Sequence, residues 1–464
     1  EERMERKAGT AVKPGETELA RQLEYIRAIR AENDAFAAEN GRKKKFYSLA
    51  MGCQMNAHDS EKLEGMLDEM GFDRTDEETE ADFIIYNTCC VRENAEQKVY
   101  GKLGWLKHYK ETKNPDAVIA LCGCMMQQET VLQTLRQKYR HVDIVFGTFN
   151  LYKLPELVAT RMESGETVYD IWQEQREVVE DLPAIRHFPY KASVNIMFGC
   201  NNFCSYCIVP YVRGRERSRT PEDILAEVRR LAADGVKEVM LLGQNVNSYG
   251  KNLETPVSFA ELLRMVNEVE GIERIRFMTS HPKDLSDELI QAMADCDKVC
   301  KYLHLPVQSG SDEILRRMNR HYTKESYMEL VRKARAAMPD ITLSTDIIVG
   351  FPGETTEEFE ETLSLLEQVR FDALFTFIFS PRVGTPAAQM DDPDSIRSFY
   401  KTLVALRKKL PVISKGKIEF LYPDNADLLA YRRYDGESEL LVLCNLRECE
   451  ITKPLPDGWA AAEK

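Results

Sequence analysis

The sequence predicts an α/β protein with an N-terminal parallel-sheet domain, a second domain of six βα units, and a small β-rich C-terminal tail. From about residue 46 to about residue 391, short apolar runs alternate with helical patterns, which is typical of strand–loop–helix units in parallel sheets. After residue 391 this alternation stops. A chain of 464 residues is long enough for two or three domains.

Composition limits the class of protein. Hydrophobic residues make up 43% of the chain, enough for real cores, and no apolar run is long enough to span a membrane. The segment EERMERKAGT is charged and unlike a signal peptide. We therefore expect a cytoplasmic protein, in which thiols stay reduced and cysteines act as ligands or catalysts. The net charge of −14 argues against a general nucleic-acid binder.

Residues 1–45 are predicted to form a helical extension, with one helix over Thr17–Asn40 that is rich in Ala, Glu and Arg. Its amphipathicity is modest, so this helix either packs on the core or remains mobile. No residue pattern there indicates chemistry.

In the N-terminal domain, three apolar runs each end in a cysteine that precedes a helical pattern: Cys53, Cys89 and Cys124. The loops of such units gather at the carboxyl edge of a parallel sheet, so these thiols can meet at one point. Cys122 fits a buried filler within a strand, and Cys90 points away from Cys89 if the chain is extended there. Spacing alone supports a shared metal site and unrelated buried thiols equally.

The second domain is predicted from repeated βα units. Helices are expected at Pro221–Asp234, which begins after the N-cap candidate Thr220, and at Thr356–Val369. Six units form a barrel-like parallel sheet, closed or open, with its active residues at the carboxyl ends of the strands. The expected strands are Ser193–Phe198, Glu238–Gly243, Arg274–Thr279, Lys301–Val307, Thr342–Val349 and Leu374–Ser380.

Cys200, Cys204 and Cys207 are the most informative residues, because they follow the first of these strands with the spacing C-x-x-x-C-x-x-C. Three thiolates on one loop can hold three irons of a cubic [4Fe–4S] cluster and leave the fourth iron open, and an open metal position allows catalysis. A zinc site would need a fourth ligand, and no Cys or His follows closely. A disulfide framework does not suit such a large chain, which leaves chance spacing as the other alternative.

Arginine occupies four alternate positions directly after this loop, at Arg213, Arg215, Arg217 and Arg219. If that run is extended, the four guanidinium groups project on one side and offer a local basic surface for a nucleic acid. The alternative is a solvated or ion-paired surface.

Taken together, the motifs resemble the radical S-adenosylmethionine (SAM) methylthiotransferase family. The resemblance runs from about Phe46 to about Asp391 and rests on GCQMN-x-x-DSE, NTC-x-VRENAE-x-K, GCM-x-Q, FGCNNFCSYCIVP, LHLPVQSGSD and DIIVGFPGET. The segment GQNVNSYG, from Gly243 to Gly250, is most similar to the branch that modifies dimethylallyl-adenosine in tRNA. The implied domains are a methylthiotransferase N-terminal domain over residues 46–165 and a partial (βα)6 radical SAM barrel over residues 186–391.

The resemblance implies two [4Fe–4S] clusters and SAM as cofactors. A cluster on Cys200, Cys204 and Cys207 would cleave SAM reductively, and the resulting radical would take hydrogen from C2 of a modified adenine. A second cluster on the other three cysteines, Cys53, Cys89 and Cys124, would supply sulfur, and a second SAM would supply the methyl group. The implied partners are the tRNA anticodon loop and a one-electron donor of the flavodoxin or ferredoxin type. The alternatives are another target, either threonylcarbamoyl-adenosine tRNA or a ribosomal protein, and a non-productive iron–sulfur fusion protein.

Polar residues at the predicted strand ends are candidates for contacts with SAM or an adenine. We assign Gly243, Gln244, Asn245 and Gln308 to cofactor binding, because neutral amides both donate and accept hydrogen bonds. Glycines at such positions equally serve turns, and a structural role for His281 is as well supported as a catalytic one.

The tail, residues 392–464, departs from the family, which normally ends in a small RNA-binding β-barrel. It resembles instead the C-terminal tail of α-glucosidase-type glycoside hydrolases, with strands at Tyr431–Tyr434 and Leu440–Leu443 around an Asp435–Gly436 turn. No catalytic carboxylate pair is identifiable, so we predict no glycosidase activity. A fused gene is the simplest explanation, and we expect weakened tRNA affinity.

Overall fold

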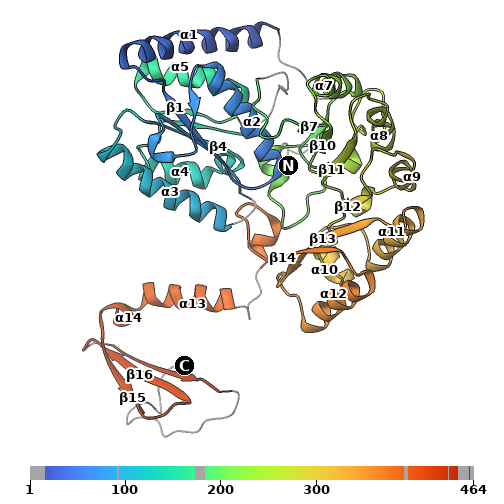
Figure 1. Ribbon diagram of the computed structural model, residues 1–464. Coiled ribbons are helices and arrows are strands. Elements are labelled where there is room, and N and C mark those ends of the chain that lie inside the picture. Colours follow the sequence, from blue (N-terminus) through green and yellow to red (C-terminus); the bar gives the residue numbers. More distant parts are fainter. Residues whose placement is uncertain are drawn as a thin grey trace. The chain divides into compact units, whose positions relative to one another are not determined.

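The computed structural model describes residues 16–90, 93–172, 183–390, 396–436, 438–447 and Trp459. The chain forms two compact units, Glu1–Met390 and Asp391–Lys464, whose described elements are shown in Figure 1. The α/β class predicted from the sequence is confirmed in both domains of the first unit. In the described residues no helix is long and apolar enough to cross a membrane.

The N-terminal domain is built on a six-stranded parallel sheet in the order β2-β1-β3-β4-β5-β6. All six residues of β3 are buried, because helices cover both faces of the sheet. Alternate residues of β3 enter different cores, with Ile84 and Tyr86 on the side of α3 and α4, and Phe83 and Ile85 on the side of α2 and α5. The elements are β1 (Lys45–Ala50), α2 (Gln54–Glu69), β2 (Asp73–Arg74), β3 (Phe83–Thr88), α3 (Glu93–Thr112), β4 (Val118–Gly123), α4 (Glu129–Lys138), β5 (Ile144–Phe146), α5 (Leu154–Ser164) and β6 (Val168–Asp170).

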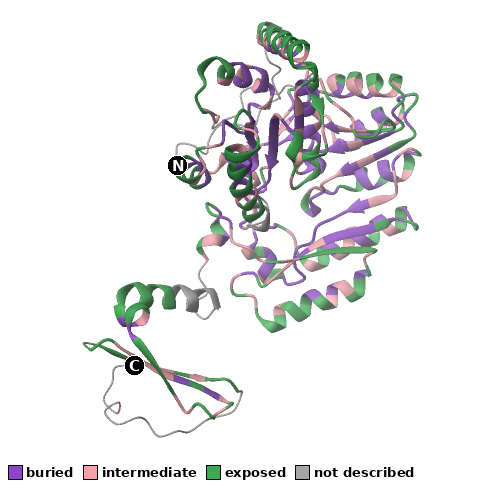
Figure 2. Ribbon diagram, turned by 60° about the vertical axis from the view of Figure 1, so that its left-hand side comes forward, coloured by how far each residue is buried: buried purple, intermediate pink, exposed green. Residues whose placement is uncertain are grey.

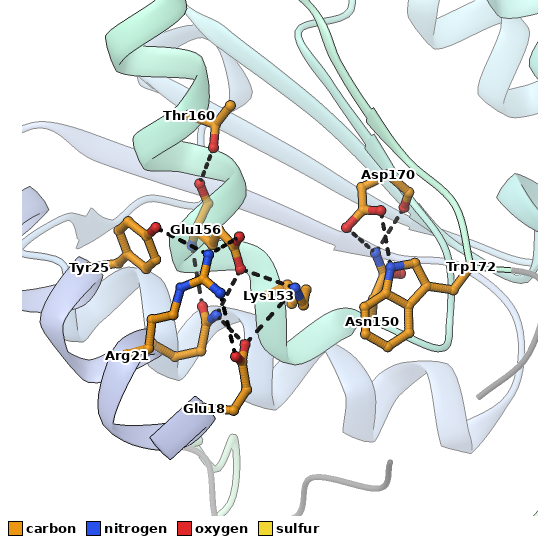
Figure 3. A network of polar contacts seen from close by, with 10 residues as sticks. Glu18, Arg21, Tyr25, Asn150, Lys153, Glu156, Thr160, Asp170 and Trp172 are labelled. Atoms are coloured by element: carbon orange, nitrogen blue, oxygen red, sulfur yellow. Dashed lines mark hydrogen bonds and ion pairs between the residues drawn. The ribbon is translucent and has the colours of Figure 1, made fainter. Parts of the chain in front are cut away.

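The N-terminal extension forms one helix, α1 (Glu16–Asn40), and packs on this domain beside α5. Ile26 and Ile29 enter the same apolar core as α2 and α5. Arg21 of α1 donates to the carboxylate of Glu156 in α5 at 2.6 Å and so joins the two helices, and the same carboxylate accepts from Lys153, the N-cap of α5, at 3.2 Å (Figure 3). The sequence left open whether this helix packs on the core or remains mobile, and in the structure it packs on the core.

The second domain contains two three-stranded parallel sheets, β7-β10-β11 and β12-β13-β14. A single parallel bridge between Ile275 and Val299 links them. Among the described residues β7 and β14 pair on one side only, so the six strands form an open barrel. The elements are β7 (Lys191–Asn195), α7 (Pro221–Ala233), β10 (Glu238–Leu242), α8 (Phe259–Asn267), β11 (Arg274–Met278), α9 (Asp287–Asp295), β12 (Tyr302–His304), α10 (Asp312–Arg317), α11 (Lys324–Ala337), β13 (Thr342–Val349), α12 (Thr356–Val369) and β14 (Ala373–Ile378).

The strand expected at Ser193–Phe198 is two elements. β7 ends at Asn195, and β8 (Met197–Phe198) pairs instead with β9 (Arg217–Ser218) as a short antiparallel ribbon. The chain leaves the three-stranded sheet β7-β10-β11 at Ile196, whose carbonyl accepts from the N–H of Arg219. This ribbon closes the base of the loop that carries Cys200, Cys204 and Cys207.

The second unit is small, and most of its described residues are at least partly exposed. It consists of α13 (Ile396–Lys409), α14 (Pro411–Lys415) and an antiparallel sheet of β15 (Lys417–Leu421), β16 (Leu428–Tyr434) and β17 (Glu439–Asn445). The predicted hairpin is confirmed, because Tyr434 pairs with Glu439 and Gly436 has a φ of +95° in the turn. Few described residues of this unit are buried, among them Val412, Leu428 and Ala430 (Figure 2).

Candidate active site

The first unit contains a cavity of about 350 Å³ where the carboxyl ends of the strands of both domains meet. It brings together eight of the ten residues that the sequence singled out as site residues. Cys89 and Asn245 are not among its lining residues, whereas Cys90 is. The predicted residues that line it are Cys53, Cys124, Cys200, Cys204, Cys207, Gly243, Gln244 and Gln308.

The loop that carries Cys200, Cys204 and Cys207 is fixed by backbone hydrogen bonds. The N–H of Cys200 donates to the carbonyl of Gly214 at 3.1 Å, and the N–H of Cys207 donates to the carbonyl of Cys204 at 2.9 Å. Gly199 has a φ of +74°, and a side chain there would collide with the backbone of Arg215. Burial raises the pKa of Cys200, and burial followed by the charge of Cys204 raises the pKa of Cys207 to about 12. Burial therefore favours the protonated thiols, and a bound metal cluster would favour the thiolates by offsetting their charge.

The cysteines of the N-terminal domain lie on three neighbouring loops, as predicted. Cys53 is the N-cap of α2, and Cys124 begins the short 3₁₀ helix η2 (Cys124–Gln127) after β4. Cys89 follows β3 and lies against Gly52, where any side chain would collide with it. Cys90 lines the cavity and hydrogen-bonds Cys124, and this bond is the main cause that lowers the pKa of Cys124. Four thiols therefore gather here, and the choice of Cys89 over Cys90 stays a prediction.

Among the residues that the structure describes, no three His, Cys, Asp or Glu side chains are arranged to hold a metal ion. A single zinc ion would draw every thiolate to about 2.3 Å. In a cubic cluster each cysteine binds a different iron, so the thiols stand further apart. The cavity is lined by Cys200, Cys204 and Cys207 from one loop and by Cys53 and Cys124 from neighbouring loops, and these thiols could serve as ligands of that kind.

Two buried arginines contact the thiols, and the sequence analysis missed both as members of the site. The Nε of Arg213 donates to the sulfur of Cys124 at 3.2 Å, and a guanidinium nitrogen of Arg320 donates to the sulfur of Cys204 at 3.4 Å. Each brings a fixed positive charge to one group of thiols. The motif VRGR directly after the cysteine loop was the available signal for Arg213.

The basic surface predicted from the arginine run is wrong. The run is not extended throughout, because α6 (Val209–Arg213) ends at Arg213 and the chain turns at Gly214, which has a φ of +75°, before the short strand β9. Arg213 and Arg219 are buried, and Arg219 donates to Glu227 and to the carbonyl of Asn195, both at 2.7 Å. The ion-paired alternative describes these two better, although they lie inside the protein.

The wall of the cavity carries several buried polar atoms without a hydrogen-bond partner. They are the Oε1 atoms of Gln244 and Gln308, the Oγ of Ser280 and the Nε2 of His281. Burial lowers the pKa of His281 to about 2, so the ring is neutral. Its Nδ1 accepts from the N–H of Lys283 at 3.2 Å, which leaves the proton on Nε2 as an unused donor. Such atoms are costly unless a polar ligand occupies the cavity.

Asn245 lies outside the lining of the cavity, although its buried Oδ1 also lacks a hydrogen-bond partner. Its side chain is fully buried outside the cavity lining, and its Nδ2 donates to the carboxylate of Asp284 at 2.8 Å. It is the N-cap of the short 3₁₀ helix Val246–Ser248 after β10, and its assignment to cofactor binding stays a prediction.

Comparisons with known proteins agree with this architecture. The Radical SAM superfamily matches residues 194–366, and the uncharacterized protein family UPF0004 matches residues 45–147. The chain is 56% identical over 402 residues to a tRNA-2-methylthio-N(6)-dimethylallyladenosine synthase of Clostridioides difficile, covering 86% of this chain and 84% of the relative. The chain belongs to this family of radical SAM enzymes. The synthase of Acetivibrio thermocellus is 58% identical over 382 residues, covering 82% and 79%.

A solved structure shows the same fold. The radical SAM methyltransferase TsrM from Kitasatospora setae superposes with a TM-score of 0.53 at 13% identity, covering 83% of this chain and 79% of that one. The family, enzyme class and fold predicted from the sequence are confirmed. Membership of the radical SAM superfamily implies a [4Fe–4S] cluster and SAM. The three thiols of one loop and the unpartnered atoms beside them fit that pair.

We expect His281→Ala to weaken SAM binding about tenfold, because the change removes a buried donor worth about 1 kcal/mol or more. Equilibrium dialysis with the reconstituted protein measures this. Since the ring stays neutral, affinity should show no step attributable to His281 between pH 5.5 and about 8. The exposed His108 of α3 provides the control His108→Ala, and equal affinity of the two variants would contradict the assignment.

Proposed function

We propose that this protein methylthiolates C2 of isopentenyl-modified adenosine next to the anticodon of tRNA, using two [4Fe–4S] clusters. The supporting observation is that thiols from two different domains open into one cavity. Ordinary acid–base side chains cannot remove hydrogen from an unactivated aromatic C–H. The reaction therefore needs a radical source and a sulfur source within reach of the same carbon.

Cys200, Cys204 and Cys207 would hold the first cluster, with SAM against its open corner. The cluster would pass one electron from the external donor to SAM, and cleavage of SAM would supply a radical able to take hydrogen from the adenine. The protein's part is placement. Arg320 offsets the thiolate charge near Cys204, and the unpartnered atoms of Gln244, Ser280, His281 and Gln308 are available to orient SAM.

Cys53, Cys89 and Cys124 would hold the second cluster, whose chemistry is to supply sulfur. In this proposal Arg213 supplies the nearby positive charge, and Cys90 donates a hydrogen bond to Cys124. The adenine must leave the stack of the anticodon loop, which costs little in a single strand. A one-electron donor of the flavodoxin or ferredoxin type and a cytoplasmic location complete the proposal.

Anaerobic reconstitution should give about eight irons per chain, because two cubic clusters are proposed. Cys200→Ala should reduce this to about four and abolish formation of 5′-deoxyadenosine. The neighbours Cys89 and Cys90 form a matched pair: Cys89→Ser should also lose about four irons, whereas Cys90→Ser should keep about eight. A count near four in the unchanged protein would remove the second cluster, and the reverse result for the pair would transfer the ligand role to Cys90.

The reaction is tested by expressing the chain in a bacterial strain that lacks its own methylthiotransferase for dimethylallyl-adenosine. Mass analysis of hydrolysed tRNA should then show the methylthio form of dimethylallyl-adenosine. Appearance of the group on threonylcarbamoyl-adenosine or on a ribosomal protein would redirect the proposal to that target. Production of 5′-deoxyadenosine with no modified product would indicate a non-productive fusion protein.

The tail is proposed to weaken tRNA binding, because residues 392–464 resemble the tail of a glycoside hydrolase more than the RNA-binding barrel usual in the family. A chimera in which residues 392–464 are exchanged for the corresponding segment of the Clostridioides difficile relative should bind an anticodon stem–loop more tightly than this chain. Titration at fixed salt measures both affinities. Equal affinities would show that the tail does not limit binding.

A further inference from the structure

Asn56, on the first turn of α2, connects the loops that carry the N-terminal cysteines. Its side chain is fully buried, and its Nδ2 donates to the carbonyl of Met51 at 3.0 Å and to the carbonyl of Thr88 at 2.9 Å. Met51 lies two residues before Cys53, and Thr88 lies directly before Cys89. Because both partners are acceptors, the orientation of the amide is determined and Oδ1 faces the thiols.

The Oδ1 of Asn56 lies 3.9 Å from the sulfur of Cys53 and 3.7 Å from that of Cys124. One amide therefore touches the loops of all three predicted ligands. The backbone carbonyl of Asn56 is itself fixed, because it accepts from the Nδ2 of Asn87 at 2.8 Å.

Arg213 reaches this amide from the other domain. It lies six residues after Cys207, at the end of α6, and is 7% exposed. Its guanidinium donates to the Oδ1 of Asn56 at 2.7 Å, to a carboxylate oxygen of Asp59 at 2.9 Å and to the sulfur of Cys124 at 3.2 Å. The preceding residue is also held, since the carbonyl of Val212 accepts from the hydroxyl of Thr148 at 2.9 Å.

A buried guanidinium is stable only while its partners are in place, since an unpaired charge in the interior is costly. The three acceptors lie on α2 and η2 of the N-terminal domain, whereas the arginine follows the cysteine loop of the second domain. The pairing therefore holds only when the two domains are docked. A hydrogen bond to a ligand sulfur and a nearby positive charge are among the factors that set the potential of an iron–sulfur cluster.

We propose that Arg213 is a positioning residue for the second thiol triplet: it holds Asn56 and Cys124 from the radical SAM loop and raises the reduction potential of the cluster bound there. This inference rests on the proposed second cluster. Arg213 lies six positions after Cys207, so it connects the loop that carries the first thiol triplet to the residues around the second.

The test uses the full chain with C200A, C204A and C207A, so that only the second triplet can bind iron. In this background R213Q should lower the midpoint potential by at least the equivalent of a tenfold change in the reduction equilibrium, about 59 mV for one electron. The EPR signal of the reduced cluster should change with it. R213K keeps the charge but not the fork that spans three acceptors, so it should give a smaller shift.

Two controls separate this role from general destabilisation. R213Q placed on C53A, C89A and C124A should leave the potential of the first cluster unchanged, and the surface variant R136Q should leave the second unchanged. If R213Q binds about four irons with the potential and EPR signal of its parent, the role of Arg213 is overturned while the proposed function stands. If the parent itself binds no iron, the second cluster and this inference both fail. Should R213Q not fold, an unchanged potential in R213K overturns the proposal.

Discussion

Parallel strands impose the constraint on which the site depends: every loop that leaves their carboxyl ends emerges on the same edge of the sheet. The N-terminal sheet brings its cysteine loops together in this way, although Cys53 and Cys124 are 71 positions apart in sequence. The open barrel does the same for the loop of Cys200 and for Gln308 after β12. Because the two edges face one cavity, neither domain contains the site alone.

Charge is the second constraint. A cavity lined by many thiols disfavours several thiolates at once, since burial raises the pKa of Cys200 and of Cys207. Two buried arginines supply positive charge that favours the thiolates: Arg213 contacts Cys124, and Arg320 contacts Cys204. Neutral groups complete the wall: His281 stays uncharged, and its Nε2 proton is a donor that adds no charge.

The sequence was sufficient for whatever depends on local spacing. The C-x-x-x-C-x-x-C loop, the strand at Thr342–Val349 and the helix at Thr356–Val369 were predicted with their correct bounds, because motif and periodicity are local signals. Side-chain direction was not predictable in the same way. The arginine run was taken as extended, yet α6 and the turn at Gly214 send Arg213 into the neighbouring domain. Asn245 belonged to a convincing motif, but its amide is used by Asp284.

The sheet of the second unit has an unusual surface. In β15 the charged Lys417 and Glu419 alternate with Ile418 and Phe420, which are 48% and 59% exposed among the described residues. An apolar strand face in water, on a strand that pairs on one side only in the described chain, favours pairing with other molecules. The exposed Ile418 and Phe420 therefore give the second unit a surface through which copies of the protein can associate at high concentration.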